Sequence, residues 1–274
     1  MSNESGSIDD RLFDAARSGN VGVLAAILDD HPEKLNILTT PHEQTMLHLA
    51  AAENRLDAVN FLLDRGLDVN ARDSAVTGDN TYPMHWAAAA GNLDVVRRLA
   101  DAGGDVVGHG DDHGLEVIGW ATGWDGCDDE THRQLADFLV SRGAPHNIWS
   151  AIAMNLPNEV RRIVKKDSAV LTRGQSHNEN DQVPLHFAAK KNRPDMIHVL
   201  VELGADASGK DPSGVTPLHL ASGHGHADAV RALLSLGADP TMRDTEHDSD
   251  PIGWAEYFEK PEIVEILKRQ GAGE

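Results

Sequence analysis

Residues Thr216–Pro240 read TPLHLASGHGHADAVRALLSLGADP and contain two short helix patterns that are separated by glycine. Thr216 is a suitable N-cap, and Pro217 occupies the first helical position, where its missing N–H costs no hydrogen bond. Gly225 supplies the left-handed residue that ends the first helix, and Gly237 ends the second helix in the same way. Such a pair cannot bury its own apolar face, so the segment predicts stacking against copies of itself.

Copies of this segment recur along the chain. The small residue Ala221, which would let a neighbouring helix approach closely, has equivalents at nearly regular intervals. The equivalent alanines are Ala15, Ala50, Ala87, Ala121, Ala151, Ala188, Ala221 and Ala255. The hexapeptides around them include TMLHLA (45–50), YPMHWA (82–87), VPLHFA (183–188) and TPLHLA (216–221).

A period of about 33 residues with a T-P-L-H-x-A signature is typical of ankyrin repeats. The strings RGLDVNARD, LGADASGKD and LGADPTMRD match the end of the second helix and the loop after it. Residues 8–270 therefore resemble an ankyrin-repeat protein. The resemblance implies an all-α fold, a solenoid of about eight stacked antiparallel helix pairs with short β-finger loops. Residues 1–7 are predicted to form a disordered lead.

The chain also contains an internal duplication. Residues 148–171 align without a gap on residues 12–35, so the fifth repeat resembles the first. The string IGWA of repeat four, at positions 118–121, recurs in repeat eight at positions 252–255. We infer a duplicated four-repeat unit and expect a change of stacking geometry at the joint near residues 144–147. The predicted parts are repeats one to four in residues 8–147 and repeats five to eight in residues 148–274.

Repeat four departs from the pattern. The interval from Ala121 to Leu135 is six positions longer than the equivalent interval from Ala87 to Val95, which indicates an insertion between its two helices. The interval from Gly143 to Ala151 is in turn much shorter than the equivalent one from Gly103 to Ala121. The shorter interval indicates that the finger loop after repeat four has been deleted.

Composition restricts the partners and the compartment. The net charge of −20 argues against nucleic acid and against an anionic membrane surface. The chain has no apolar run long enough for a membrane span, and its first residues carry no secretion signal. The single cysteine, Cys127, excludes an internal disulfide framework and fits a reducing cytosol. We expect a cytoplasmic monomer without nucleic-acid or membrane partners.

The 15 histidines raise the question of a metal site. Four of them take the fourth place of the hexapeptide, where the imidazole is expected to bridge neighbouring loops by hydrogen bonds: His48, His85, His186 and His219. Helical HExxH spacing and paired cysteines are absent, so no metal site is assigned.

A richer group of His, acidic and Trp residues surrounds the insertion in repeat four, and part of it recurs in repeat eight. Such a group can line a small-ligand pocket, or it can fix the same loop twice by local hydrogen bonds, which we favour. The candidate pocket residues are Asp112, His113, Trp120, Trp124, Cys127, Glu246, His247 and Trp254.

No nucleophile elbow, P-loop or dinucleotide fingerprint occurs, so no catalytic residue and no cofactor is assigned. Ankyrin proteins generally bind protein partners on a concave face that is formed by finger tips and first helices. The resemblance implies that the residues at the corresponding positions of this chain bind the partner. They are Glu53, Arg72, Asp79, Ala90, His109, Asp111, Trp124, Lys190, Lys191, Lys210, His224, Arg243 and Tyr257.

The expected function is therefore that of a protein–protein interaction scaffold. The alternative is a ligand-binding or catalytic variant that uses the repeat-four loop, residues 109–132. A third hypothesis, an inhibitor whose acidic face mimics a phosphate backbone, is supported by the net charge alone.

Overall fold

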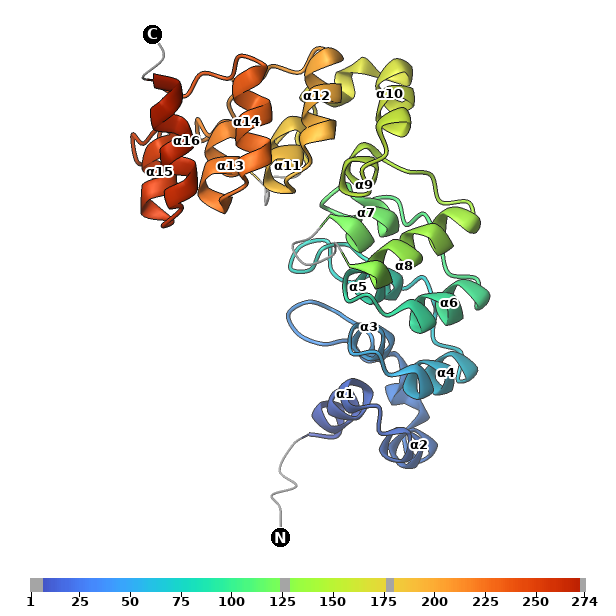
Figure 1. Ribbon diagram of the computed structural model, residues 1–274. Helices are drawn as coiled ribbons and strands as arrows, with labels where there is room; N and C mark the ends of the chain where they lie inside the picture. Colours follow the sequence, from blue (N-terminus) through green and yellow to red (C-terminus); the bar gives the residue numbers. More distant parts are fainter. Residues whose placement is uncertain (1–6, 124–128, 176–179, 272–274) are drawn as a thin grey trace. The chain divides into compact units, whose positions relative to one another are not determined.

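The computed structural model describes residues 7–123, 129–175 and 180–271 as helices joined by loops, and no strand occurs within these ranges. The chain forms two compact units, one that ends at Pro145 and one that begins at His146. In each unit the helices are arranged as antiparallel pairs (Figure 1). The all-α stack of helix pairs predicted from the sequence is confirmed.

The first unit contains four helix pairs. Its helices are α1 (Ile8–Ser18), α2 (Val21–Asp30), α3 (Met46–Ala52), α4 (Leu56–Asp64), α5 (Pro83–Ala89), α6 (Leu93–Asp101), α7 (Glu116–Thr122) and α8 (Glu130–Ser141). A 3₁₀ helix, η1 (Pro32–Asn36), follows the first pair. Helices α1, α3, α5 and α7 pack on one another in one row, and α4, α6 and α8 pack in a second row beside it (Figure 1).

The second unit repeats this order. Its helices are α9 (Ile148–Ala153), α10 (Pro157–Lys166), α11 (Pro184–Lys190), α12 (Pro194–Glu202), α13 (Pro217–His224), α14 (Ala227–Ser235), α15 (Pro251–Tyr257) and α16 (Pro261–Gly271). Here too a 3₁₀ helix, η2 (Ser168–Thr172), follows the first pair. We call the first helix of each pair the inner helix, the second the outer helix, and the loop that leads to the next inner helix the finger.

The helix boundaries follow the local sequence signals. Thr216 caps α13 by accepting from the N–H of His219, Pro217 is its first residue, and Gly225 ends it with φ 78°. One cap differs from expectation. Ser7, which was predicted to belong to the disordered lead, caps α1 by accepting from the N–H of Asp10. Ser7 fits because its short hydroxyl reaches the first turn from an extended backbone.

The index alanines form the seam between neighbouring inner helices. All eight are at most 4% exposed: Ala15, Ala50, Ala87, Ala121, Ala151, Ala188, Ala221 and Ala255. A methyl group at this position lets the inner helices stack closely, while the leucines and valines of both rows fill the space between inner and outer helices. The repeating alanine is therefore a packing requirement of the stack.

The fingers are held without regular strands. In the finger before α5 the N–H of Asp73 donates to the carbonyl of Thr81 (3.0 Å), and the corresponding bond before α15 joins Asp244 to Ser249 (3.0 Å). Neighbouring fingers are linked by single backbone bonds, such as the one from Asp112 to Asp79 (3.0 Å). The fingers are thus hydrogen-bonded loops that follow the helix stack.

The two irregularities of repeat four are present in the helix boundaries. Residues 123–129 separate α7 from α8, whereas only residues 90–92 separate α5 from α6. Between α8 and α9 the chain has residues 142–147, too few for a finger of the length found between α6 and α7. None of the described helices is long and apolar enough to cross a bilayer.

Candidate functional site

The four motif histidines join neighbouring repeats. In His48, His85 and His219 the Nδ1 atom accepts a backbone N–H at the start of its own helix (3.1 Å in each case). The Nε2 atom therefore carries the proton and donates to a carbonyl of the next finger. These bonds are 3.0–3.1 Å long and join His48 to Thr81, His85 to Gly108, His186 to Val215 and His219 to Ser249. The predicted bridging role is confirmed.

Burial keeps these imidazoles neutral. Desolvation lowers the pKa of His85 from 6.5 to about 4, and it also lowers the pKa values of His48, His186 and His219. His226 has a comparable structural use, because its Nε2 lies 3.0 Å from the carbonyl oxygen of Lys190. These histidines are therefore committed to the stack and are not available as ligands.

In repeat four two of the residues proposed for a pocket, His113 and Trp120, pack against each other. Asp111 accepts from the N–H groups of His113, Leu115 and Glu116 and from the indole of Trp120 (2.8–3.2 Å). The His113 ring meets the Trp120 ring edge-on at 5.4 Å, and its Nε2 lies 3.2 Å from Asp79 Oδ1. This arrangement is the loop-fixing one, since Asp111 orders its own finger and His113 ties that finger to the preceding one.

Several of the residues predicted to bind a partner or to line a pocket are not found at an open surface. Asp111 was expected to contact a partner, but it is 6% exposed and its oxygens are occupied, so it lies under the surface. Lys191 is also buried, with Nζ 5.9 Å from the centre of the Phe187 ring. Trp124 and Cys127 lie outside the described residues. Asp112 is exposed.

The finger residues of the predicted partner surface mostly link fingers together. Arg72 is half-buried, stacks over the Tyr82 ring at 4.2 Å, and donates to the Tyr82 hydroxyl (2.9 Å) and to the carbonyl oxygens of Asn80 and His109. Lys210 is exposed and donates to the carbonyl of Arg243 (2.8 Å). Arg243 is exposed and pairs with the Asp248 carboxylate (3.1 Å).

Other residues of that set have their side chains at the surface of the inner helices and fingers. The exposed ones are Glu53, Ala90, His109, His224 and Tyr257, whereas Asp79 and Lys190 are half-buried. His109 pairs with Glu116 (2.7 Å), and the His224 ring stacks on His226 at 5.5 Å. The exposed set is distributed over both units.

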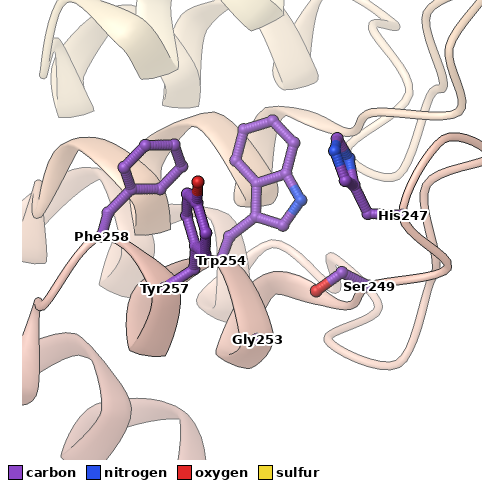
Figure 2. A pocket seen from close by; sticks show the side chains of 6 residues that line it. All are labelled: His247, Ser249, Gly253, Trp254, Tyr257 and Phe258. Atoms are coloured by element: carbon purple, nitrogen blue, oxygen red, sulfur yellow. The ribbon is translucent and has the colours of Figure 1, made fainter.

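A pocket of about 560 Å³ lies in repeat eight (Figure 2). Its lining residues come from one finger and from α15 with the residue after it: His247, Ser249, Gly253, Trp254, Tyr257 and Phe258. Figure 2 shows the Phe258, Tyr257, Trp254 and His247 rings side by side, with Ser249 below them. Tyr257 is 81% exposed and Phe258 48%, so the aromatic wall is open to solvent.

The rings of this wall are held from behind. The indole N–H of Trp254 donates to Asp244 Oδ2 (2.9 Å), and its ring meets the His219 ring edge-on at 5.5 Å. Burial alone would raise the pKa of Asp244, but hydrogen bonds from the His247 N–H and the Trp254 indole lower it below the ordinary value. The Asp244 carboxylate is therefore ionised, and it fixes the orientation of Trp254.

Repeats four and eight share a glycine in place of the bridging histidine. Gly119 and Gly253 stand where repeats two, three, six and seven carry that histidine, so neither repeat has an imidazole beside its inner helix at this position. A Cβ at Gly253 would clash with Ser249 Oγ. The glycine at 253 therefore gives room to Ser249, but because repeat four carries a glycine at the same position, it does not by itself explain why the pocket is open in repeat eight.

The difference lies in the finger histidine of each repeat. In repeat four His113 is held against Trp120 by Asp79 of the preceding finger. In the duplicated unit Ser213 takes the position that corresponds to Asp79, and the Nδ1 atom of His247 lies 3.8 Å from Asp244 Oδ1 of its own finger. His247 is exposed and lines the pocket.

Sequence reasoning found part of this pocket. Trp254, His247 and Tyr257 were among the predicted residues, while Glu246 is exposed but does not line the pocket. Ser249, Gly253 and Phe258 were missing from the predicted set. A signal for Gly253 existed in the hexapeptide alignment, where glycine replaces histidine beside a tryptophan.

Within the described ranges, no group of three or more His, Cys, Asp or Glu side chains could hold a metal ion.

Comparisons with known proteins agree with the repeat pattern. A family model described as "Ankyrin repeats (3 copies)" matches residues 9–73 and 148–244, and one described as "Ankyrin repeats (many copies)" matches residues 47–100. Alpha-latrocrustotoxin-Lt1a of Latrodectus tredecimguttatus is 37% identical over 65 residues, which are 23% of this chain and only 4% of the toxin. The crystal structure of the human ASB11 ankyrin repeat domain is 18% identical with a TM-score of 0.51, and the match covers 93% of this chain and 96% of that one.

Proposed function

The chain belongs to the ankyrin-repeat family, and on this premise we propose that it is a scaffold that binds a protein partner on its finger and inner-helix face. Ankyrin repeats are generally protein–protein interaction modules. The observation that carries the proposal is the open aromatic pocket of repeat eight, where Tyr257 and Phe258 are exposed at the end of an inner helix. Exposed aromatic side chains beside a pocket are frequent anchors of protein interfaces.

The charge distribution supports a protein partner over other classes. With a net charge of −20 the surface repels phosphate backbones and anionic lipid. The proposal keeps the expectation of a cytoplasmic monomer, since the one cysteine, Cys127, provides no internal disulfide. The small-ligand alternative in repeat four is not favoured, because His113 and Trp120 are buried against each other.

Quantitative capture from an extract of the cells of origin tests the proposal. The face variant carries Glu53→Ala, His109→Ala and Tyr257→Ala, all at exposed positions of fingers and inner-helix ends. We expect it to lose the proteins that the unmodified chain enriches.

The matched control carries three exposed substitutions on the outer helices, Asp57→Ala, Asp137→Ala and His198→Ala. It should retain those proteins. Equal capture by both variants, or enrichment of no protein above background, would contradict the proposed function.

A further inference from the structure

We infer that the repeat-eight pocket binds the guanidinium group of an arginine side chain in a basic segment of the partner protein. The inference rests on the proposed function and specifies the chemistry of its recognition. It starts from the described lining of the pocket, which combines three aromatic rings with one imidazole and one hydroxyl and contains no Asp, Glu, Lys or Arg side chain.

The rings offer aromatic faces, which attract cations because the ring face is the negative side of the quadrupole. Tyr257 and Phe258 meet edge-on, with ring centres 5.0 Å apart at 89°, and Phe258 lies 5.9 Å from Trp254 at 58°. The three rings thus pack on one another and line one pocket, and a cation above an open aromatic face is attracted by the ring quadrupole. Tryptophan gives the strongest such attraction among the three residue types.

The buried Asp244 strengthens this site without entering it. Its carboxylate accepts the Trp254 indole N–H at 2.9 Å, a charge-assisted hydrogen bond that adds electron density to the ring. Asp244 is only 3% exposed, so its charge acts on a ligand through the indole and through space and not by direct contact. The indole keeps a fixed orientation and needs no rearrangement on binding.

Two rings of the wall pack against α13. A Cβ at Gly223 would lie 3.0 Å from Trp254 Cε3 and 3.1 Å from Phe258 Cδ2, so both rings already touch the backbone of the neighbouring inner helix. A preformed aromatic wall loses little conformational entropy when a ligand binds. Tyr257, at 81% exposed, lies at the rim.

The surroundings favour a positive ligand. Residues 243–262 contain seven carboxylates against two basic side chains, and Arg231 and Lys268 pair with two of these carboxylates, Glu262 and Glu256, so the local balance is −3. The carboxylates are Asp244, Glu246, Asp248, Asp250, Glu256, Glu259 and Glu262, and the basic residues are Arg243 and Lys260. Such a field attracts a cationic segment and raises its rate of association.

Arginine suits the pocket better than lysine. A guanidinium is planar, is more weakly hydrated than an ammonium and stacks on aromatic faces, whereas an ammonium would lose a strong hydration shell in a pocket without a lining carboxylate. The Ser249 hydroxyl and the His247 ring can accept from its N–H groups. The volume of about 560 Å³ lies within the range of about 300–1,000 Å³ that is usual for ligand pockets.

The test is a solution NMR titration of the full chain with the pentapeptide acetyl-Gly-Gly-Arg-Gly-Gly-amide. Two further peptides carry citrulline, which has the same shape without the charge, or lysine at the centre. With the arginine peptide we expect saturable chemical-shift changes at residues 247–258. The affinity for the citrulline peptide should be lower than that for the arginine peptide by roughly tenfold or more. Equal affinity for citrulline or lysine, or shifts spread over the acidic surface, would overturn the assignment.

Variants separate the pocket from general charge attraction. Tyr257→Ala removes an exposed ring without changing charge and should weaken arginine binding by roughly three- to tenfold. Val76→Ala, at a residue that is 90% exposed in the other unit, should leave it unchanged. An unaltered affinity in Tyr257→Ala would refute the site. The two proposals fail separately when capture is repeated with Glu53→Ala and His109→Ala alone, because this double variant leaves the pocket intact.

Discussion

Gly108 is the residue at which the contact between two repeats is tightest. It has φ 70°, and a Cβ there would lie 2.6 Å from both His85 Cε1 and Val117 Cγ2. Gly103 has a similar φ of 89°, but a Cβ built there has no atom within 4 Å. An alanine at 103 therefore carries only the cost of the left-handed backbone, without a packing clash. We expect Gly108→Ala to lower the free energy of unfolding by about 1–3 kcal/mol more than Gly103→Ala. Urea unfolding of the two variants measures this difference. An equal loss of unfolding free energy in both variants would contradict the tight contact at Gly108.

His85 makes the stability of the protein depend on pH. Burial lowers its pKa from 6.5 to about 4, so between these values the unfolded chain binds a proton that the folded chain does not. The free energy of unfolding is therefore highest above about pH 7 and falls as the pH drops from 6.5 toward 4, with a contribution of roughly 3 kcal/mol from this residue.

His85→Gln should lower stability at pH 7 and flatten the fall between pH 6.5 and 4, while the exposed His198→Gln should leave the slope unchanged. Denaturant unfolding at several pH values provides the comparison. The account of His85 is wrong if both variants retain the slope of the unmodified chain.

At the scale of the element, each of three fingers is organised by one buried aspartate. Asp73, Asp111 and Asp244 each accept an indole N–H from the inner helix that follows, at 3.4, 3.1 and 2.9 Å respectively. Asp111 also accepts three backbone N–H groups, which together set the entry into α7. The side chain thus couples the shape of a loop to the position of a helix.

Replacing Asp111 by asparagine puts an NH₂ group where an acceptor is required. Hydrogen bonds to a charged group contribute about 1.5–3 kcal/mol each when broken singly, so we expect Asp111→Asn to lower the free energy of unfolding by about 2–3 kcal/mol. The neighbouring Asp112→Asn, at an exposed position, should change it by less than about 0.5 kcal/mol. Thermal and urea unfolding compare the two, and an asparagine that is tolerated at 111 would show that the carboxylate does not organise the finger.

For the molecule as a whole, periodic features were predictable and singular ones were not. The period, the index alanines and the bridging histidines recur in several repeats, so each copy supports the others in predicting the stack. Asp111 could not be placed correctly from its finger position, because its burial depends on the distant Trp120 indole. The repeat-eight pocket is not periodic, because its lining includes Tyr257, which has no aromatic counterpart in repeat four, and its shape depends on how the rings pack.

The central claim is that a protein partner binds the finger and inner-helix face. Site-specific photo-crosslinking tests it most directly, with a benzophenone side chain placed in turn at positions 109 and 257 on that face and at position 198 on an outer helix. The claim predicts that the same protein from an extract of the cells of origin is crosslinked at 109 or 257 and not at 198. A partner that is crosslinked at 198 alone, or no crosslinked protein at any position, would contradict it.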